Sequence, residues 1–269
     1  MTKGCLIFIG LGLNDEKDIS LKGLDEIKKC DKVFAEFYTA KLTGTDIEKI
    51  KKILGKNIEV LTREETEKGD RIINIAKEKS VALLTCGDPM TATTHVDIRL
   101  RAEKQGIKTK IIHGSSIVTA VPGLLGLQNY KFGRSTTIAY PEKNYFPTSP
   151  YNVIKENKQI GLHTLIFLDI QSDKKRYMTA NEGMNLLLKM EEKHKGNIIK
   201  QDSVICVVAR AGSSEPINIA GKFEDLISRD FGPPLHTIVI PGKLHFMEIE
   251  ALQTLAQLPA QQGRKLQKL

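Results

Sequence analysis

The sequence of 269 residues lacks long apolar segments, and this absence limits where the protein can work. No apolar run approaches the ~20 residues that a membrane-spanning helix needs. The first residues, Met1 to Leu6, lead directly into a strand pattern, without an apolar secretory segment or a cleavage site. We therefore expect a cytoplasmic protein that does not enter a membrane.

The sequence also has no cluster of metal ligands. Its four cysteines, Cys5, Cys30, Cys86 and Cys206, are scattered and form no C-x-x-C pair. Zinc sites need closely spaced thiolates or imidazoles, so no metal is expected. The cysteines are expected to be buried, reduced thiols. No base accompanies Cys86 in the sequence to make it a nucleophile.

Two phosphate-binding motifs are missing or incomplete. The sequence contains no G-x-x-x-x-G-K-[ST] segment, which excludes a P-loop nucleotidase. Gly10-x-Gly12 begins a dinucleotide fingerprint, but Asp15 stands where the third glycine belongs. A nicotinamide-dependent oxidoreductase that holds a ribose with Glu36 is therefore an alternative and not the main interpretation.

Positive charge exceeds negative charge, with 40 Lys and Arg against 32 Asp and Glu. A basic surface can attract nucleic acid. However, the lysines are spread over the surfaces of predicted helices, which is typical of a solvated surface. No nucleic acid is therefore required as a partner. The tail, residues 259–269, is locally basic, and we expect it to be disordered.

Short apolar runs bounded by glycine or proline alternate with helical segments, a pattern typical of an α/β fold. The first half predicts parallel strands over residues 5–9, 32–37, 58–61, 81–85 and 108–112. The second half, after a glycine-rich break, predicts strands over residues 135–139, 164–168, 204–209 and 237–240. We expect an N-terminal α/β domain over residues 1–130 and a C-terminal α/β domain over residues 131–258.

Local signals set where two helices begin. Ser20 is expected to cap a helix over residues 21–30. Thr179 and Glu182 form a capping box before a helix that runs to about His194. Residues 141–150 are irregular and rich in proline. Their aromatic side chains leave two interpretations open: a lid or interface element, or a loop packed on its domain.

Two loops are candidates for a binding site, because each follows an apolar strand. The first is Gly10-Leu11-Gly12-Leu13, and the second begins with Gly87-Asp88-Pro89. Open α/β sheets bind ligands at the carboxyl ends of parallel strands, so both loops are expected at one small-molecule site. Asp88 either points into that site or forms an Asx turn. His95, which has no second ligand at metal spacing, is expected to pack or to cap a helix.

These loops and further motifs resemble the tetrapyrrole methylase family. The resemblance extends from about residue 4 to residue 255 and includes Ala92-Thr93-Thr94-His95, Tyr130-Lys131-Phe132-Gly133, Gly161-Leu162-His163-Thr164, Ala209-Arg210-Ala211-Gly212 and Pro241-Gly242-Lys243-Leu244-His245. It is greatest for the branch of the family that modifies translation elongation factor 2. The resemblance implies two α/β domains with the active site in a cleft between them.

The resemblance further implies S-adenosylmethionine as cofactor, S-adenosylhomocysteine as product and no metal. The positions that match the family's cofactor contacts are Leu13, Asp88, Thr91, Ser116, Ile117, Leu168, Ala211 and His236. Thr91 is expected to contribute through its backbone. The implied substrate is the amino group of an aminocarboxypropyl-histidine on elongation factor 2, and the compact chain is expected to add three methyl groups. A homodimer is implied as well.

Methyl transfer from a sulfonium is an in-line displacement that depends on positioning. The amine has to be neutral when it attacks, so a proton acceptor is required. Asp88 is the candidate acceptor, with binding of the cofactor as its other interpretation. Two more alternatives stay open: a methylase of the same family that acts on a corrinoid or on ribosomal RNA, and a non-enzymatic module that binds the cofactor or the factor.

Overall fold

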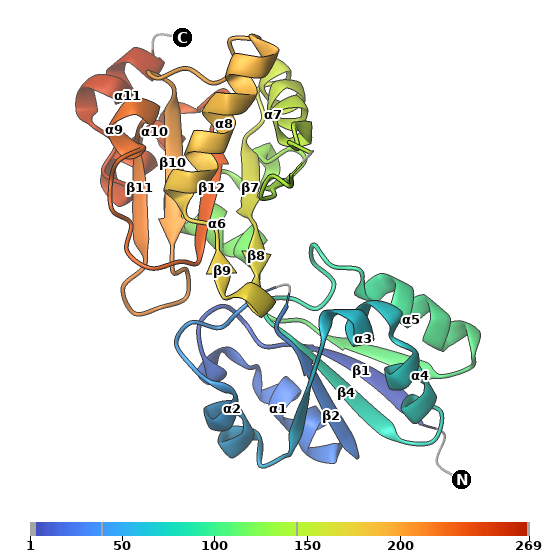
Figure 1. Cartoon of the computed structure of the whole chain (residues 1–269). Helices are drawn as coiled ribbons and strands as arrows, with labels where there is room; N and C mark the ends of the chain where they lie inside the picture. The colour runs from blue at the N-terminus through green and yellow to red at the C-terminus, as the bar shows by residue number, and fades with distance from the viewer. Residues whose placement is uncertain (1–3, 39, 144, 268–269) are drawn as a thin grey trace. The chain divides into compact units, whose positions relative to one another are not determined.

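The computed structural model describes residues 4–38, 40–143 and 145–267. Its internal contacts divide the chain into two compact units. Unit 1 comprises Met1–Ile117 and Gln171–Lys175, and unit 2 comprises Val118–Ile170 and Arg176–Leu269. Each unit combines a β-sheet with helices, which confirms the predicted α/β class (Figure 1). This division assigns residues 118–130 to unit 2, and the domain boundary near residue 130 stays a prediction.

Unit 1 is built on a five-stranded sheet whose strands are all parallel. In sheet order the strands are β3 (Ile58–Leu61), β2 (Lys32–Glu36), β4 (Ser80–Thr85), β1 (Cys5–Gly10) and β5 (Lys108–Ile112). They correspond to the five strands predicted in the first half. Because all strands are parallel, their carboxyl ends meet at one edge, where β1 lies between β4 and β5.

Helices cover both faces of this sheet. They are α1 (Leu21–Lys29), α2 (Ile47–Leu54), α3 (Arg63–Lys68), α4 (Asp70–Ala76) and α5 (His95–Lys104), with a helical turn η1 (Glu16–Asp18). Ile7 and Ile9 of β1 enter the core with α1 and α2, whereas Leu6 and Phe8 enter the core with α4 and α5. Apolar residues on both faces are expected for a parallel sheet that is buried on both sides.

Unit 2 is built on a five-stranded mixed sheet. In sheet order the strands are β11 (Ile217–Lys222), β10 (Val204–Ala209), β12 (His236–Ile240), β7 (Thr164–Leu168) and β6 (Thr136–Ile138). β6 and β7 are parallel, and β12 is antiparallel to both β7 and β10. The carboxyl ends of β7 and β10 therefore lie at the same edge as the start of β12. β11, antiparallel to β10, was not predicted.

Helices of unit 2 complete its cores. They are α6 (Ile117–Leu125), α7 (Ser149–Gln159), α8 (Ala180–His194), α9 (Phe223–Leu226), α10 (Phe246–Leu255) and α11 (Ala260–Gln267). Its short elements are the turn η2 (Asn129–Lys131) and the strand β9 (Arg176–Tyr177), which pairs with β8 (Ile170–Gln171). The turn η3 (Ser172–Lys174) groups with unit 1. Met184 and Leu187 of α8 are fully buried in one core with Ile166 and Ile238 of the sheet.

Both predicted helix caps are confirmed. The Ser20 hydroxyl accepts the Gly23 N–H at 3.0 Å where α1 begins. At the start of α8, the Thr179 hydroxyl accepts the Glu182 N–H at 3.2 Å, and the Glu182 carboxylate accepts the Thr179 N–H at 2.8 Å. Each cap satisfies backbone donors that a helix leaves free at its first turn.

The tail requires a correction. The sequence predicted disorder, but residues 260–267 form α11, which packs on α10. Gly263 of α11 lies so close to α10 that a Cβ on Gly263 would collide with the Gln253 side chain. A short polar helix is marginal alone, and packing on a neighbour stabilises it. Residues 268–269 of the predicted tail lie outside the described residues.

The proline-rich stretch is packed at one of its two aromatic positions. Phe146 packs against the core of unit 2, which favours the interpretation of a packed loop at this point. Tyr145 is 63% exposed, and its backbone exchanges hydrogen bonds with Glu142 at 3.0 and 3.1 Å. Residue 144 of the stretch lies outside the described residues.

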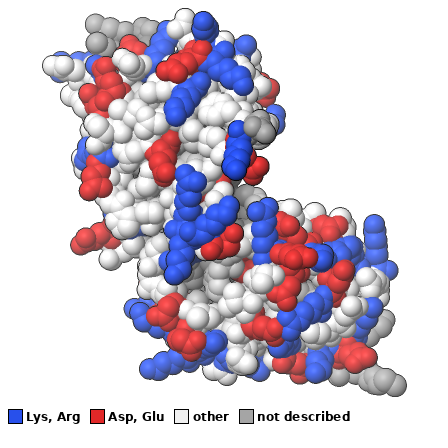
Figure 2. All heavy atoms as spheres, in the orientation of Figure 1, with Lys and Arg blue, Asp and Glu red and all other residues white. Residues whose placement is uncertain are grey.

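Charges of opposite sign are interspersed over the face of the molecule that Figure 2 shows. Ion pairs along helices, such as Arg63 with Glu67 at 2.7 Å and Lys51 with Glu48 at 2.8 Å, belong to this pattern. Within the described ranges, every helix is too short or too polar to cross a bilayer. The same ranges contain no group of three His, Cys, Asp or Glu residues that is placed to hold a metal ion.

Candidate functional site

The loop after β1 is held by one carboxylate. Asp18 accepts the backbone N–H groups of Leu13, Asn14 and Asp15 at 3.1, 2.7 and 3.4 Å. Gly12 adopts the left-handed region, with φ 81°, and its Cα faces the Asp18 side chain too closely for any Cβ. A loop that cradles a pyrophosphate keeps such amides free for the ligand. Here the Asp18 carboxylate already accepts these N–H groups, and this argues against the dinucleotide-binding alternative.

The loop after β4 is folded around Asp88. Its Oδ1 accepts the Met90 N–H at 2.9 Å and the Thr91 hydroxyl at 3.5 Å, and its backbone carbonyl accepts the Thr91 N–H at 3.2 Å. The Asx turn considered from the sequence is therefore formed. The Asp88 side chain remains 10% exposed at the edge of the sheet.

Three strand ends meet through glycines. Gly12 and Gly87 exchange backbone hydrogen bonds of 2.7 and 3.4 Å, which join the loops after β1 and β4. A Cβ on Gly10 would lie 2.5 Å from the Gly87 oxygen and 2.6 Å from the nitrogen of Gly114, which follows β5. Real side chains do not tolerate such distances, so glycine is required where these backbones touch. The loops after β1, β4 and β5 thus form one surface.

His113 is a site residue that the sequence analysis missed. It follows β5 as Asp88 follows the end of β4, and its Nδ1 lies 2.7 Å from Asp88 Oδ2. The imidazole is 73% exposed, whereas the carboxylate beneath it is nearly buried. The signal that could have found His113 is its position directly after a predicted strand, beside Gly114.

The remaining predicted positions of unit 1 lie on the same surface. Thr91 belongs to the Asp88 turn, Leu13 follows the Gly12–Gly87 contact, and Ser116 and Ile117 come two and three residues after Gly114. Ser116 is buried, and Ile117 begins α6. The five predicted positions of unit 1 thus lie in or directly beside the loops after β1, β4 and β5.

Other polar residues near this edge are buried and do not face solvent. Glu36 and His95 are fully buried, and the Nδ1–H of His95 donates to the Pro89 carbonyl at 3.0 Å. His95 packs as expected, and Glu36 has no exposed atom for a ribose on the surface. Burial raises the pKa of the Cys86 thiol far above its usual range, because a thiolate would be desolvated there. Cys86 is thus a buried thiol, as predicted.

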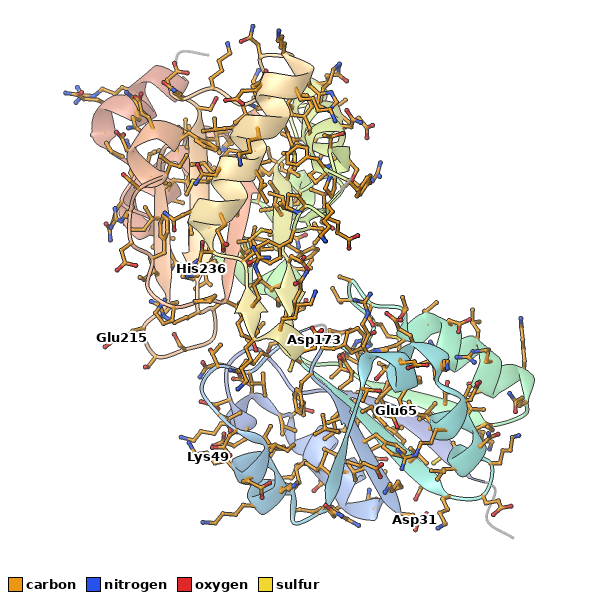
Figure 3. The ribbon with its side chains drawn as sticks, viewed as in Figure 1. Asp31, Lys49, Glu65, Asp173, Glu215 and His236 are labelled. Atoms are coloured by element: carbon orange, nitrogen blue, oxygen red, sulfur yellow. The ribbon has the colours of Figure 1, made fainter. Side chains whose placement is uncertain are left out.

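The predicted positions of unit 2 share a different edge. Leu168 ends β7, Ala211 follows β10 by two residues, and His236 begins β12, where it pairs with Ala209 of β10 (Figure 3). All three residues are buried. The edge therefore offers apolar surface and backbone groups more than charge.

His236 has both ring nitrogens bonded within unit 2. Nδ1 accepts the Ala180 N–H at 3.0 Å, and the Nε2–H donates to the Pro233 carbonyl at 3.1 Å. Burial lowers the pKa of His236 and so favours its neutral form. A ligand would meet the ring face or the backbone of His236, since its polar atoms are occupied. The cleft expected between the two domains stays a prediction.

The chain matches an established family over most of its length. The sequence pattern of the Tetrapyrrole (Corrin/Porphyrin) Methylases matches residues 5–226. The chain belongs to this family. Among its relatives, "Diphthine synthase" of Methanococcus maripaludis strain S2 is 56% identical over 251 residues, 93% of this chain and 98% of the relative. "Diphthine synthase" of Methanocaldococcus jannaschii is 56% identical over 255 residues, 94% of this chain and 99% of the relative.

Solved structures agree with the sequence relatives. A crystal structure of a diphthine synthase has a TM-score of 0.89 and 44% sequence identity and covers 97% of this chain and 99% of its own. A crystal structure of a putative diphthine synthase from Entamoeba histolytica has a TM-score of 0.86 and 38% sequence identity. The match covers 95% of this chain and 100% of that chain. The chain is therefore an S-adenosylmethionine-dependent methyltransferase similar to diphthine synthases.

Proposed function

We propose that this protein transfers methyl groups from S-adenosylmethionine to the amino group of an aminocarboxypropyl-histidine on translation elongation factor 2. Three transfers to one nitrogen would give a quaternary ammonium. The observation that carries this proposal is 56% identity to diphthine synthases with almost complete coverage of both chains.

The loop surface of unit 1 fits a cofactor of this kind. A Cβ placed on Gly87 would meet its nearest neighbour, the Ser115 carbonyl oxygen, at 4.0 Å, so a ligand atom can approach the Gly87 backbone closely. Buried Ser116 and the adjoining Ile117 supply polar and apolar contacts beside this space. We propose that Leu13, Asp88, Thr91, Ser116 and Ile117, with Leu168, Ala211 and His236 of unit 2, contact the cofactor.

The chemistry requires positioning and removal of protons. When bound, S-adenosylmethionine supplies a methyl group that is displaced from sulfur as the amine lone pair forms the new N–C bond, and the bonding pair stays on sulfur. Holding nucleophile and carbon in near-attack geometry can remove roughly 7–11 kcal/mol of barrier. Starting from an ammonium, one proton has to leave nitrogen before each of the three transfers. The protein therefore needs a proton acceptor at the site, and Asp88 with its partner His113 offers one.

Mass spectrometry of elongation factor 2 tests the proposed function. The factor carrying the aminocarboxypropyl-histidine is incubated with the protein and S-adenosylmethionine, and the added methyl groups are counted. We expect three, all on the histidine side chain. The factor with an unmodified histidine serves as control and should remain unchanged.

The same assay separates the alternatives. Methylation of ribosomal RNA or of a corrinoid precursor, with none of the factor, would contradict the proposal. Binding of S-adenosylhomocysteine without turnover on any of these substrates would favour a non-enzymatic module.

We further infer a homodimer that works in the cytoplasm, where translation supplies its substrate. Light scattering of the purified protein measures the assembly directly. A mass of twice 30.0 kDa is expected. A monomer at micromolar concentration would contradict the inference.

A further inference from the structure

The Asp88–His113 pair leaves one basic atom exposed. A carboxylate only accepts hydrogen bonds, so the 2.7 Å contact requires a proton on His113 Nδ1. In the neutral imidazole the lone pair then lies on Nε2. Among the residues that the structure describes, no partner occupies Nε2, and the ring is 73% exposed. The pair thus presents an oriented base to the solvent side of the loop surface.

The other candidate proton acceptors at this edge are already hydrogen-bonded or buried. Asp88 accepts Met90 N–H and the Thr91 hydroxyl on Oδ1 and faces His113 with Oδ2. Asp18 is turned inward to the N–H groups of the first loop. Glu36 is fully buried. Of these four groups, His113 is the one whose side chain is mostly exposed.

We infer that His113 is the proton acceptor of the methyl transfer and that Asp88 positions it. This inference rests on the proposed function. The N–H bond of the substrate ammonium breaks, its electron pair stays on nitrogen, and the proton moves to Nε2 of His113. The positive imidazolium faces the Asp88 carboxylate, and the proton passes to water before the next transfer. The amine, now neutral, provides the lone pair for the new N–C bond.

The charges around His113 suit this role. The carboxylate of Asp88 stabilises the imidazolium that forms. On β5 itself, Lys110 is paired with Glu26 of α1 at 3.0 Å, and on the loop after β1 the Asp18 carboxylate is engaged by backbone amides. Asp88 is therefore the charged group in direct contact with the ring.

The variant His113→Gln separates chemistry from structure. Glutamine can still donate a hydrogen bond to Asp88 but has no basic nitrogen. We expect the single-turnover rate of methyl transfer to the factor to fall roughly a hundredfold. The dissociation constant for S-adenosylhomocysteine should change by less than about twofold, because binding does not use the lone pair. The matched control is His194→Gln, an exposed histidine that stacks on Tyr151 in unit 2, and it should keep the wild-type rate.

Chemical rescue is a second measurement, and it would show no effect if His113 had only a structural role. In His113→Ala the lost ring leaves space beside Asp88, and added imidazole should restore part of the rate in a concentration-dependent manner. Imidazole should not accelerate the His194→Gln control.

The outcomes distinguish this inference from the function on which it rests. If the wild-type protein methylates the factor and His113→Gln does so equally fast, the inference is overturned and the proposed function stands. If His113→Gln is slow only because the cofactor no longer binds, the inference is overturned as well. If the wild-type protein transfers no methyl group to the factor, both are overturned.

Discussion

The two units each contain a carboxylate–histidine pair, and the pairs differ in what surrounds them. The open pair is Asp88 with His113 in unit 1, joined at 2.7 Å, with the histidine mostly exposed. The closed pair is Glu248 with His163 in unit 2, joined at 2.9 Å, with both side chains fully buried. The contact itself is almost the same, so its distance does not distinguish a reactive pair from a structural one.

The second ring nitrogen distinguishes them. In the closed pair, His163 Nδ1 accepts the Gly242 N–H at 3.0 Å, so the imidazole has no atom left for a ligand. The Glu248 carboxylate is saturated as well, because it also accepts the Lys131 ammonium and the N–H groups of Gln128 and His245. In the open pair, His113 Nε2 faces solvent. Reactivity in such a pair depends on the nitrogen that remains available.

Breaking the closed pair should have the largest effect on stability. Burial acts to raise the pKa of Glu248, but the N–H groups and side chains that donate to it outweigh burial and lower the pKa to about 2. Glu248→Gln removes this charge and leaves Lys131 without its buried partner. We expect the free energy of unfolding to fall by about 3 kcal/mol, measured by urea denaturation at pH 7.

A matched surface substitution provides the control for Glu248. Glu156 pairs with Arg134 at 3.3 Å with both side chains more than half exposed. Such a pair contributes little because water screens it. Glu156→Gln should therefore change the unfolding free energy by less than about 0.5 kcal/mol. Equal losses in the two variants would remove the distinction between a buried and an exposed carboxylate.

Breaking the open pair should affect catalysis more than stability. Asp88→Asn keeps the shape of the side chain but removes the charge that faces the His113 ring. We expect kcat for methylation of the factor to fall about a hundredfold, while the unfolding free energy changes by about 1 kcal/mol at most. Steady-state kinetics and urea denaturation measure the two effects. If both activity and cofactor affinity survive, Asp88 has no electrostatic role.

The glycine contacts that support the open pair give a third test. Gly114 adjoins His113, and a Cβ there would collide with the Gly87 carbonyl oxygen. Gly114→Ala should cost about 2 kcal/mol of unfolding free energy and weaken cofactor binding, because backbone has to shift. The control is Gly123→Ala within α6, where the new methyl group meets nothing within 4 Å beyond the adjacent residues and the backbone of the helix itself, and a slight gain of stability is expected. Calorimetry with S-adenosylhomocysteine and urea denaturation measure both variants.

The pH dependence of stability gives a fourth test. Burial lowers the pKa of His163 and of His236, so both stay neutral in the folded protein while the unfolded chain takes up protons near pH 6.5. Their contribution to stability is present above pH 6.5 and is lost as the pH falls below it. We expect a loss of up to about 1.4 kcal/mol per pH unit for each histidine. Urea denaturation between pH 7 and pH 5.5 should show a shallower dependence in His236→Asn than in the wild type.

The sequence predicted most of the fold because local signals agreed with tertiary packing. The strands of unit 1 were readable because short apolar runs alternate with helical segments, and the caps at Ser20 and Thr179 are properties of a few adjacent residues. β11 was missed because Ile217–Lys222 is rich in small and polar residues. Its place depends on a distant partner, with Ala220 N–H donating to Ala256 O at 2.7 Å.

Half of the open pair was predictable, and the other half was not. Asp88 stands in a motif that signals a turn, whereas His113 has no local motif beyond its place after a strand. The two residues are 25 positions apart and meet because β4 and β5 flank β1. That order of strands follows from packing across the whole sheet. His95, which stands in a recognisable motif, is instead fully buried in the core.

The path of the chain has a consequence for recombination among relatives. Unit 1 is assembled from two stretches, because Gln171–Lys175 groups with Met1–Ile117 although the chain on both sides of it belongs to unit 2. The polypeptide therefore changes unit after residues 117, 170 and 175. A chimera with a single crossover after residue 117 would inherit five residues of unit 1 from the wrong parent. Exchange of a whole unit needs three crossovers.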